Sequence, residues 1–347
     1  MFLLAITKNG ISQDFGSKKV EELNIHSLIG TVIIDKFLSD FISESDSFSI
    51  LESPLVGSSK IHDIFFSKIN FQNNERKITV YKPFHSGRPV FYHINSKGEF
   101  FCSSHITMLR KAGVTIAENS SSLPEFFIYR YVIPPKTLYK NIKQLIPGSK
   151  LNIKISNDRC KIINVKKFNP FSINSNELSN IDIIVNNVKR LLNESINNLN
   201  PKKDRLSVLL SGGIDSSILF KLCQQHFNIN QSYSTGYPLD NLDINTEKKY
   251  ALTAAEVFDS SHSYYSDTME SYLEAIIEGI SKAEEPFNRL QSAMIYLLFK
   301  NGLPIDKNVV ISGYGADGIF GDVYQRYLFL SERLFKIMKI QFFFFFF

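Results

Sequence analysis

The sequence predicts two unlike halves, a β-rich first half followed by an α/β second half. Residues 1 to about 165 contain short runs of β-branched and aromatic residues separated by turn clusters, at the spacing of a β-sandwich. From residue 201 onward, apolar runs of strand length alternate with longer runs at helical spacing, which predicts a mostly parallel sheet. A chain of 347 residues is long enough for two such cores.

In the first half, four runs predict strands between turn clusters such as HSGRP: KITVYKP at 77–83, RPVFYHI at 88–94, GEFFCSS at 98–104 and SKLNIKI at 149–155. The stretch 117–139 predicts a helix that ends before a Pro-Pro break.

Between the halves lie a polar, turn-rich linker at 169–180 and an amphipathic helix at 181–198. These patterns divide the chain into domains at 1–165 and 201–347, joined by a linker and helix at 166–200.

In the second half, four strands alternate with helices. We predict strands at 206–210, 231–237, 261–265 and 308–312, and helices at 216–226, 246–258, 268–283 and 290–302.

The composition excludes several classes of protein. A hydrophobic content of 44% with 21% charged residues indicates a soluble globular chain. The net charge of +5 is small and scattered, which predicts no nucleic-acid partner. No window is apolar enough to span a bilayer, and the start lacks the pattern of a signal peptide, so we expect a cytoplasmic protein without membrane contact.

Cysteine and histidine spacing excludes two kinds of site. Cys102, Cys160 and Cys223 form no CxxC motif or even framework, which predicts buried free thiols in a reducing compartment. The histidines show no zinc-ligand spacing.

The stretch LSVLLSGGIDSSILFKL at 206–222 has the pattern of a phosphate cradle. An apolar strand runs into Gly212 and Gly213, whose backbone amides can face a ligand, and a helix N-terminus follows. Ser211, Ser216 and Ser217 add hydroxyl groups. Asp215 would repel bare phosphate, so its presence indicates a bridging metal ion. The alternative is a tight strand-to-helix turn in which Asp215 and Ser216 act only as caps.

A second glycine-rich loop lies in VVISGYGADGIFGDV at 309–323. It also follows an apolar strand, and it carries Tyr314 and Asp317 among its glycines. A carboxylate between glycines is a poor core residue, which favours a ligand-binding role for Asp317.

Together the two loops resemble those of the asparagine synthetase superfamily, and the resemblance extends over most of residues 75–322. It implies that the chain uses ATP and Mg²⁺ to adenylate a carboxylate, releases pyrophosphate and passes the acyl group to an amine. It also implies an N-terminal Ntn-hydrolase-like (class II glutamine amidotransferase-like) β-sandwich followed by a Rossmann-like PP-loop ATP pyrophosphatase domain. The implied substrate is a small amino-acid-type carboxylate, and a homodimer is expected.

The resemblance also implies the site residues. Asp215 and Asp317 would bind Mg²⁺. The implied ATP-binding residues are Leu209, Ser211, Gly212, Gly213, Asp215, Ser216, Ser217, Thr235, Ser312 and Gly313. The implied catalytic residues are Tyr314, Asp215 and Asp317. Glu284, Glu285 and Arg289 occupy the part of the family fold that lines the acceptor pocket, with an exposed loop of ordinary ion pairs as the alternative.

Two departures narrow the expected reaction. Glutamine-hydrolysing members carry a cysteine nucleophile after the initiator methionine, whereas this chain has Phe2, so the first domain is expected to be an inactive amidotransferase. Tyr314 replaces an acidic residue and matches the β-lactam synthetase branch, in which a tyrosine–glutamate pair deprotonates the substrate's own amine. The alternative for Tyr314 is an aromatic ring packed over the loop or nucleotide.

Other departures from the family pattern weigh against full activity. Gly318 and Asp322 stand where the family often has glutamate and glycine. The chain ends about 25 residues after the loop, and six phenylalanines at 342–347 indicate a truncated or frameshifted end. Lys336 and Lys339 come too early for the family's late lysine, and Glu332 is a poor match for the glutamate partner of Tyr314. The alternatives to a cyclase are an ammonia- or glutamine-dependent asparagine synthase and a non-catalytic nucleotide-binding fragment.

Overall fold

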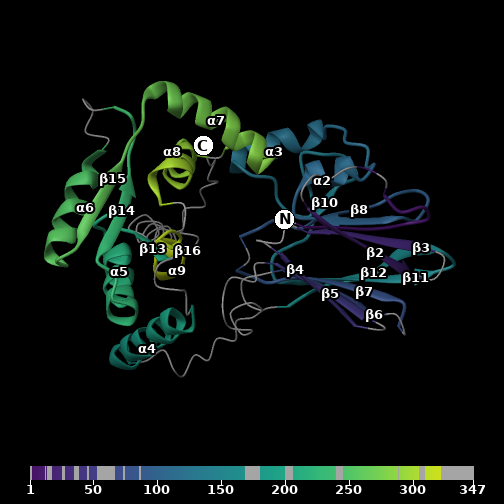
Figure 1. Ribbon diagram of the computed structural model, residues 1–347, viewed down its shortest axis with the longest axis horizontal. Coiled ribbons are helices and arrows are strands. Elements are labelled where there is room, and N and C mark those ends of the chain that lie inside the picture. Colours follow the sequence, from purple (N-terminus) through teal and green to yellow (C-terminus); the bar gives the residue numbers. More distant parts are fainter. Residues whose placement is uncertain are drawn as a thin grey trace, which may run out of the picture. The chain divides into compact units, whose positions relative to one another are not determined.

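The computed structural model describes residues 2–11, 13, 18–25, 28–34, 39–44, 47–52, 67–72, 75–85, 87–168, 180–199, 206–239, 245–287, 289–304 and 309–321. The chain forms two compact units (Figure 1). Unit 1 comprises Met1–Pro201 and Ser281–Asn288, and unit 2 comprises Lys202–Ile280 and Arg289–Phe347. The domain boundaries predicted at residues 165 and 201 stay a prediction.

Unit 1 contains two six-stranded sheets whose strands pair antiparallel. The first sheet has the order β10 (Lys143–Gln144), β8 (Phe91–Ile94), β9 (Phe100–Ser103), β1 (Phe2–Thr7), β3 (Leu28–Ile34) and β2 (Lys19–Ile25). The second has the order β12 (Arg159–Lys167), β11 (Ser149–Ser156), β7 (Lys77–Lys82), β6 (Lys68–Gln72), β5 (Ser47–Glu52) and β4 (Ser39–Glu44). The β-rich first half predicted from the sequence is therefore confirmed.

The core of unit 1 follows the alternation of side chains along β1. Phe2, Leu4 and Ile6 point into a cluster shared with Ile78 and Leu151 of the second sheet. Leu3 and Ala5 point the other way, into a cluster that also contains residues of α2 (Ile106–Lys111). Both faces of β1 are therefore buried, which explains why its sequence is apolar throughout. The helix predicted before the Pro-Pro break is α3 (Leu123–Tyr129).

Unit 2 contains a four-stranded, wholly parallel sheet in the order β15 (Ser261–Tyr265), β14 (Gln231–Thr235), β13 (Leu206–Leu209) and β16 (Val309–Ile311). The connecting helices are α5 (Ile214–Phe227), α6 (Thr246–Val257), α7 (Met269–Ala283), α8 (Gln291–Leu297) with a π-helical turn at Leu298–Gly302, and α9 (Ala316–Phe320). Each predicted strand and helix of the second half is confirmed.

Helices cover both faces of this sheet. Lys248 of α6 lies over the ring of Tyr264, whereas Leu298, directly after α8, packs with Tyr233 and the adjacent Tyr265. Neighbouring residues of a strand point to opposite faces, so α6 and the end of α8 lie on opposite sides of the sheet (Figure 1). This arrangement is what a parallel sheet requires, because its strands must be buried on both sides.

Three further expectations can be compared with the structure. The amphipathic helix predicted at 181–198 is α4 (Ile181–Leu199), whereas residues 169–179 of the predicted linker lie outside the described residues. All three cysteines are free and buried, as predicted. Among the described helices, none is both long and apolar enough to cross a membrane.

Candidate ATP-binding site

The two glycine-rich loops leave the sheet of unit 2 where its strand order reverses. β14 and β15 extend from one side of β13, and β16 pairs on its other side, with Val208 opposite Ile311. The loops that follow β13 and β16 therefore emerge side by side at the carboxyl ends of two adjacent strands. In open parallel sheets this reversal point is where ligands bind.

Hydrogen bonds within the first loop fix its shape. The amide of Ser211 donates to Oγ of Ser216 at 3.2 Å, and that hydroxyl donates to the carbonyl of Gly213 at 3.1 Å. The amide of Gly213 donates to Oγ of Ser211 at 3.3 Å. Ser216 is buried, and its hydroxyl links the amide of Ser211 to the carbonyl of Gly213. Ser217 is half-buried in the first turn of α5.

Gly212 adopts a left-handed conformation against helix α6. Its φ is +81°, and a Cβ atom at this position would lie 2.3 Å from the carbonyl carbon of Tyr250. Any side chain would therefore collide with helix backbone, which cannot move aside cheaply. The contact identifies Tyr250 as a supporting residue that sequence reasoning missed, because no local pattern links the loop to α6.

Asp215 lies in the first turn of α5 but does not cap it. The N-cap residue of α5 is Gly213, and no side chain bonds to the cap amides. The carboxylate of Asp215 makes no hydrogen bond to any residue in the described part of the chain. The alternative in which Asp215 serves only as a cap is therefore wrong, and its charge is available to a ligand.

The second loop packs directly on the first. A Cβ atom on Gly313 would lie 3.0 Å from the amide nitrogen of Ser216 and 3.1 Å from Cβ of Asp215. In the same loop, Oγ of Ser312 accepts a hydrogen bond from the amide of Tyr314 at 3.4 Å. The structure thus brings together the two loops that the sequence singled out separately.

Tyr314 and Asp317 lie at the surface. The residue Tyr314 is 77% exposed, so its ring does not pack over the loop. Gly315 follows with a φ of +89° and turns the chain into α9, whose second residue is Asp317. One carboxylate oxygen of Asp317 accepts a hydrogen bond from the amide of Gly318 at 2.9 Å, and the residue is exposed.

The remaining predicted site residues lie at the ends of the inner strands. Thr235 is the last residue of β14 and is half-buried. Gly236 follows it, and a Cβ atom there would lie 1.7 Å from the hydroxyl of Tyr264. Leu209, the last residue of β13, is half-buried and packs against the cluster that contains Tyr233.

A hydrogen-bonded tyrosine–aspartate pair lies at the same edge of the sheet, at the end of β15. The hydroxyl of Tyr265 donates to Oδ2 of Asp267 at 2.6 Å. This bond, with one from the amide of Thr268, lowers the pKa of the Asp267 carboxyl, whereas burial raises the pKa of Tyr265. Asp267 was not predicted, and it lies two strands away from the paired loops.

The residues present fit a magnesium ion that is shared with a phosphate ligand. The described residues contain no group of three or more metal-ligating side chains. Mg²⁺ does not need one, because it is usually held by one or two carboxylates together with substrate phosphates and water. Asp215 and Asp317, each free of an ion pair within the described ranges, supply a carboxylate from each loop.

Comparison with known proteins accounts for both units. An asparagine synthase family model matches residues 187–341, and a glutamine amidotransferase domain model matches residues 39–164. The "Asparagine synthetase [glutamine-hydrolyzing] 1" of Bacillus subtilis strain 168 is 23% identical over 268 residues, which is 76% of this chain. The chain belongs to the asparagine synthetase superfamily.

This superfamily member spans 40% of the length of that Bacillus relative. A solved structure, glutamine phosphoribosylpyrophosphate amidotransferase from B. subtilis complexed with ADP and GMP, matches 57% of this chain and 32% of its own at 15% identity. Its TM-score of 0.18 is too low to support any inference about structure.

Phe2 is part of the core of unit 1. The resemblance described above places a cysteine nucleophile at this position in glutamine-hydrolysing members. Phe2 is 1% exposed and belongs to the cluster between the two sheets. Its amide donates to Oγ of Ser104 at 3.2 Å, and its carbonyl accepts a hydrogen bond from Oγ of Ser103 at 2.6 Å. The side chain at this position packs against apolar residues of both sheets.

Glu284 was considered for the acceptor pocket and has a structural role instead. Its carboxylate accepts hydrogen bonds from the amides of Ile106 and Thr107, the latter at 2.7 Å, and from the hydroxyl of Thr107. It therefore caps the start of α2, whose own N-cap residue His105 bonds to none of those amides. A carboxylate at this helix end is also favoured by the helix dipole.

Proposed function

We propose that this chain is an ATP- and magnesium-dependent ligase that adenylates a carboxylate and forms a carbon–nitrogen bond. The observation that carries the proposal is the contact of Gly313 with Asp215 and Ser216, which joins the two glycine-rich loops at the reversal point of a parallel sheet. Membership of the asparagine synthetase superfamily supports the same reaction class.

In this proposal the sheet is a Rossmann-like PP-loop domain and the first loop binds the pyrophosphate end of ATP. Gly212 gives the loop its shape, while Ser211, Gly213 and Ser217 offer hydroxyl and amide donors to phosphate oxygens. The hydroxyl of Ser216 would exchange its bond to the Gly213 carbonyl for one to phosphate, or would keep the loop rigid. Leu209, Thr235, Ser312 and Gly313 would surround the nucleoside and the α-phosphate.

The proposed chemistry has two steps. A carboxylate oxygen of the substrate attacks the α-phosphorus of ATP, the bond to the β-phosphate oxygen breaks, and pyrophosphate leaves. An amine then attacks the acyl carbon, its proton passes to a base, and AMP leaves. A magnesium ion bound by Asp215 and Asp317 would neutralise charge on the phosphates. The chain's own contribution is to position the reacting groups and offer donors where negative charge develops.

The source of the amine follows from two residues. The buried ring of Phe2 supports an amidotransferase unit that does not release ammonia from glutamine. The exposed ring of Tyr314, in the second loop, supports a role for its hydroxyl toward a substrate amine. We therefore favour a β-lactam-type cyclase that uses the substrate's own amine. An asparagine synthase that uses free ammonia is the second candidate, supported by the Bacillus relative.

The experiment is pyrophosphate release by the purified full chain. The chain would be incubated with MgATP and single amino acids or β-amino acids bearing a second carboxylate, with and without ammonium. Release that depends on one carboxylate supports the ligase, and ammonium dependence of product separates the two candidates. A folded chain that binds MgATP but releases no pyrophosphate with any carboxylate is a nucleotide-binding protein, and the ligase is then excluded.

A further inference from the structure

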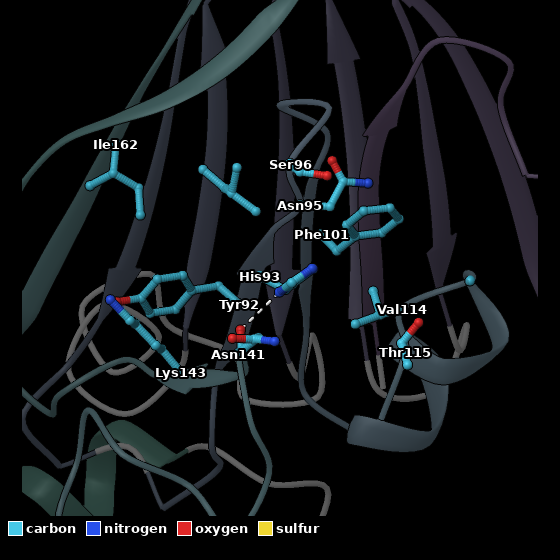
Figure 2. A pocket seen from close by; sticks show the side chains of 12 residues that line it. Tyr92, His93, Asn95, Ser96, Phe101, Val114, Thr115, Asn141, Lys143 and Ile162 are labelled. Carbon is cyan, nitrogen blue, oxygen red and sulfur yellow. Dashed lines mark hydrogen bonds between the residues drawn. The ribbon is translucent and has the colours of Figure 1, made fainter. Parts of the chain in front are cut away.

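Unit 1 contains a cavity of about 610 Å³ that is lined by its own residues. Figure 2 shows His93 near its middle, with Tyr92, Lys143 and Ile162 on one side and Phe101 and Val114 on the other. These side chains come from β8, β9, β10, β12 and the segment after α2. The volume lies in the range of small-molecule sites, which is about 300–1,000 Å³.

The cavity lies beside the edge of the first sheet, where the edge strand β10 has only two residues. β10 pairs with β8 only through Lys143 opposite Tyr92 and Gln144 opposite Phe91. Before these pairs the chain turns away at Asn141, which has a φ of +63°. The edge of β8 beyond Tyr92 therefore has no described neighbouring strand, and the space beside it stays open.

A β-bulge forms part of the far wall. Asn152 of β11 lies opposite Asn164 of β12, but the next residue, Ile153, lies opposite Ile162, so Ile163 is the extra residue. A bulge bends its strand and changes the direction of neighbouring side chains. Ile162 lines the cavity, whereas Ile163 is 53% exposed.

One polar group of the cavity is oriented by the fold. Nδ1 of His93 lies 2.8 Å from the carbonyl oxygen of Asn141. A carbonyl oxygen only accepts, so Nδ1 carries the proton, and Nε2 remains for another partner. Figure 2 shows this second ring nitrogen pointing away from Asn141. By contrast, the side chain of Asn95 already has partners. Its NH₂ group donates a hydrogen bond to Glu99 at 2.7 Å, and its oxygen accepts hydrogen bonds from two backbone amides.

The charge of the cavity wall is positive. No aspartate or glutamate is among the residues that line it, and Lys143 has no carboxylate partner in the described ranges of the chain. Tyr92, Phe101, Val114 and Ile162 supply aromatic and aliphatic surface. A lone ammonium group beside apolar walls favours a ligand with one negative charge and an apolar body.

We propose that this cavity binds a small monocarboxylate with an aromatic ring, whose carboxylate faces Lys143 and whose ring contacts Phe101 or Ile162. The site lies in the amidotransferase-like unit and does not depend on the function proposed for unit 2.

The test uses phenylacetate as the probe, with the full chain labelled with ¹⁵N and followed by amide resonances. We expect saturable shifts at Tyr92–Ser96 and at Gly113–Thr115. The neutral isostere phenylacetamide and the ring-free anion acetate should each bind roughly three- to fivefold more weakly, as expected for the loss of a partly exposed charge pair or of a ring contact. Absence of saturable shifts at these amides would overturn the proposal.

Variants locate the charge and the ring. Lys143→Gln should lower the affinity for phenylacetate to the affinity that the unaltered chain has for phenylacetamide. Lys140→Gln is the control, because Lys140 is exposed and lies outside the cavity wall, and it should not change the affinity. Thr115→Trp, at an exposed position on the wall, should fill the cavity and abolish the shifts. If phenylacetate binds equally well to the Lys143→Gln variant and to the unaltered chain, Lys143 does not bind the carboxylate. If phenylacetate binds tightly to a folded Thr115→Trp variant, the cavity is not the binding site.

Discussion

The two units differ in what the fold does with the positions where chemistry is expected. In unit 1, position 2 is a phenyl ring enclosed by two sheets, and both of its backbone polar groups are bonded to serine residues. In unit 2, Asp215, Tyr314 and Asp317 keep their functional groups out of the core. A ring enclosed between two sheets stabilises the fold, so the comparison assigns a packing role to position 2 and leaves Asp215, Tyr314 and Asp317 available to a ligand.

The largest expected effect is on the stability of unit 1. Phe2→Ala removes a fully buried ring, and we expect the free energy of unfolding to fall by about 3–5 kcal/mol. Chemical denaturation followed by a probe in unit 1 measures it, with Phe2→Leu as a control that should lose less. A loss below about 1 kcal/mol, smaller than that for typical core truncations, would contradict the packing of Phe2. Phe2→Cys should hydrolyse no glutamine, because its thiol would face the core.

The next effect compares one glycine from each of the two glycine-rich loops. Gly212→Ala and Gly315→Ala each place an alanine in the left-handed backbone conformation. This conformation costs about 1–2 kcal/mol of unfolding free energy at each position. Only Gly212 meets helix backbone, whereas a Cβ atom on Gly315 would meet nothing within 4 Å. We therefore expect Gly212→Ala to lose about 3 kcal/mol of unfolding free energy or more and to lose ATP binding. Equal losses for the two variants would show that the contact with Tyr250 does not restrain the loop.

A smaller effect concerns one step of the proposed reaction. Tyr314→Phe should leave ATP-dependent pyrophosphate release unchanged while it slows formation of the carbon–nitrogen bond by about 100-fold, the scale of a lost proton-transfer group. Rapid-quench measurement of both products in one reaction provides the ratio. If both rates fall together, Tyr314 has a role in binding, and if neither falls, the cyclase is contradicted.

The smallest effect is common to both units. Burial raises the pKa of the Cys160 thiol and of the Cys223 thiol to about 12, and Cys102 is also buried. A thiol with a raised pKa stays protonated until the pH passes that value, so at pH 8 almost no thiolate forms at Cys160 or Cys223. We expect a disulfide reagent to label none of the three in the native chain and all three after denaturation. Rapid labelling of one thiol would identify a unit that opens locally.

The sequence predicted unit 2 in more detail than unit 1 because its signals are local. Strands that alternate with amphipathic helices can be recognised from periodicity, and the two loops could be paired because neighbouring parallel strands end at one edge. In unit 1 the named strands stop at residue 155, before β12 (Arg159–Lys167). Its bulge at Ile163 shifts the alternation of apolar and polar residues and hides the strand.

Contacts between distant residues account for the rest of the difference. The carbonyl of Tyr250 restricts Gly212, and Glu284 caps α2, yet no local pattern contains either pair. Glu284 shows the consequence most clearly, because a carboxylate in a polar loop has the same appearance in a sequence whether it binds a substrate or a helix end. Only the fold identifies its partner.

The central claim is that Asp215 and Asp317 bind one magnesium ion between two loops, and a double-mutant cycle on MgATP affinity tests it most directly. Asp215→Asn and Asp317→Asn should each weaken MgATP binding without changing the unfolding free energy, because neither side chain is part of the core. Asp259→Asn, at an exposed residue beyond α6, is the matched control. If both carboxylates hold one ion, the double variant should bind MgATP little worse than the weaker single variant. Losses that add independently within about 0.3–0.5 kcal/mol would place the two carboxylates in separate sites and contradict the account.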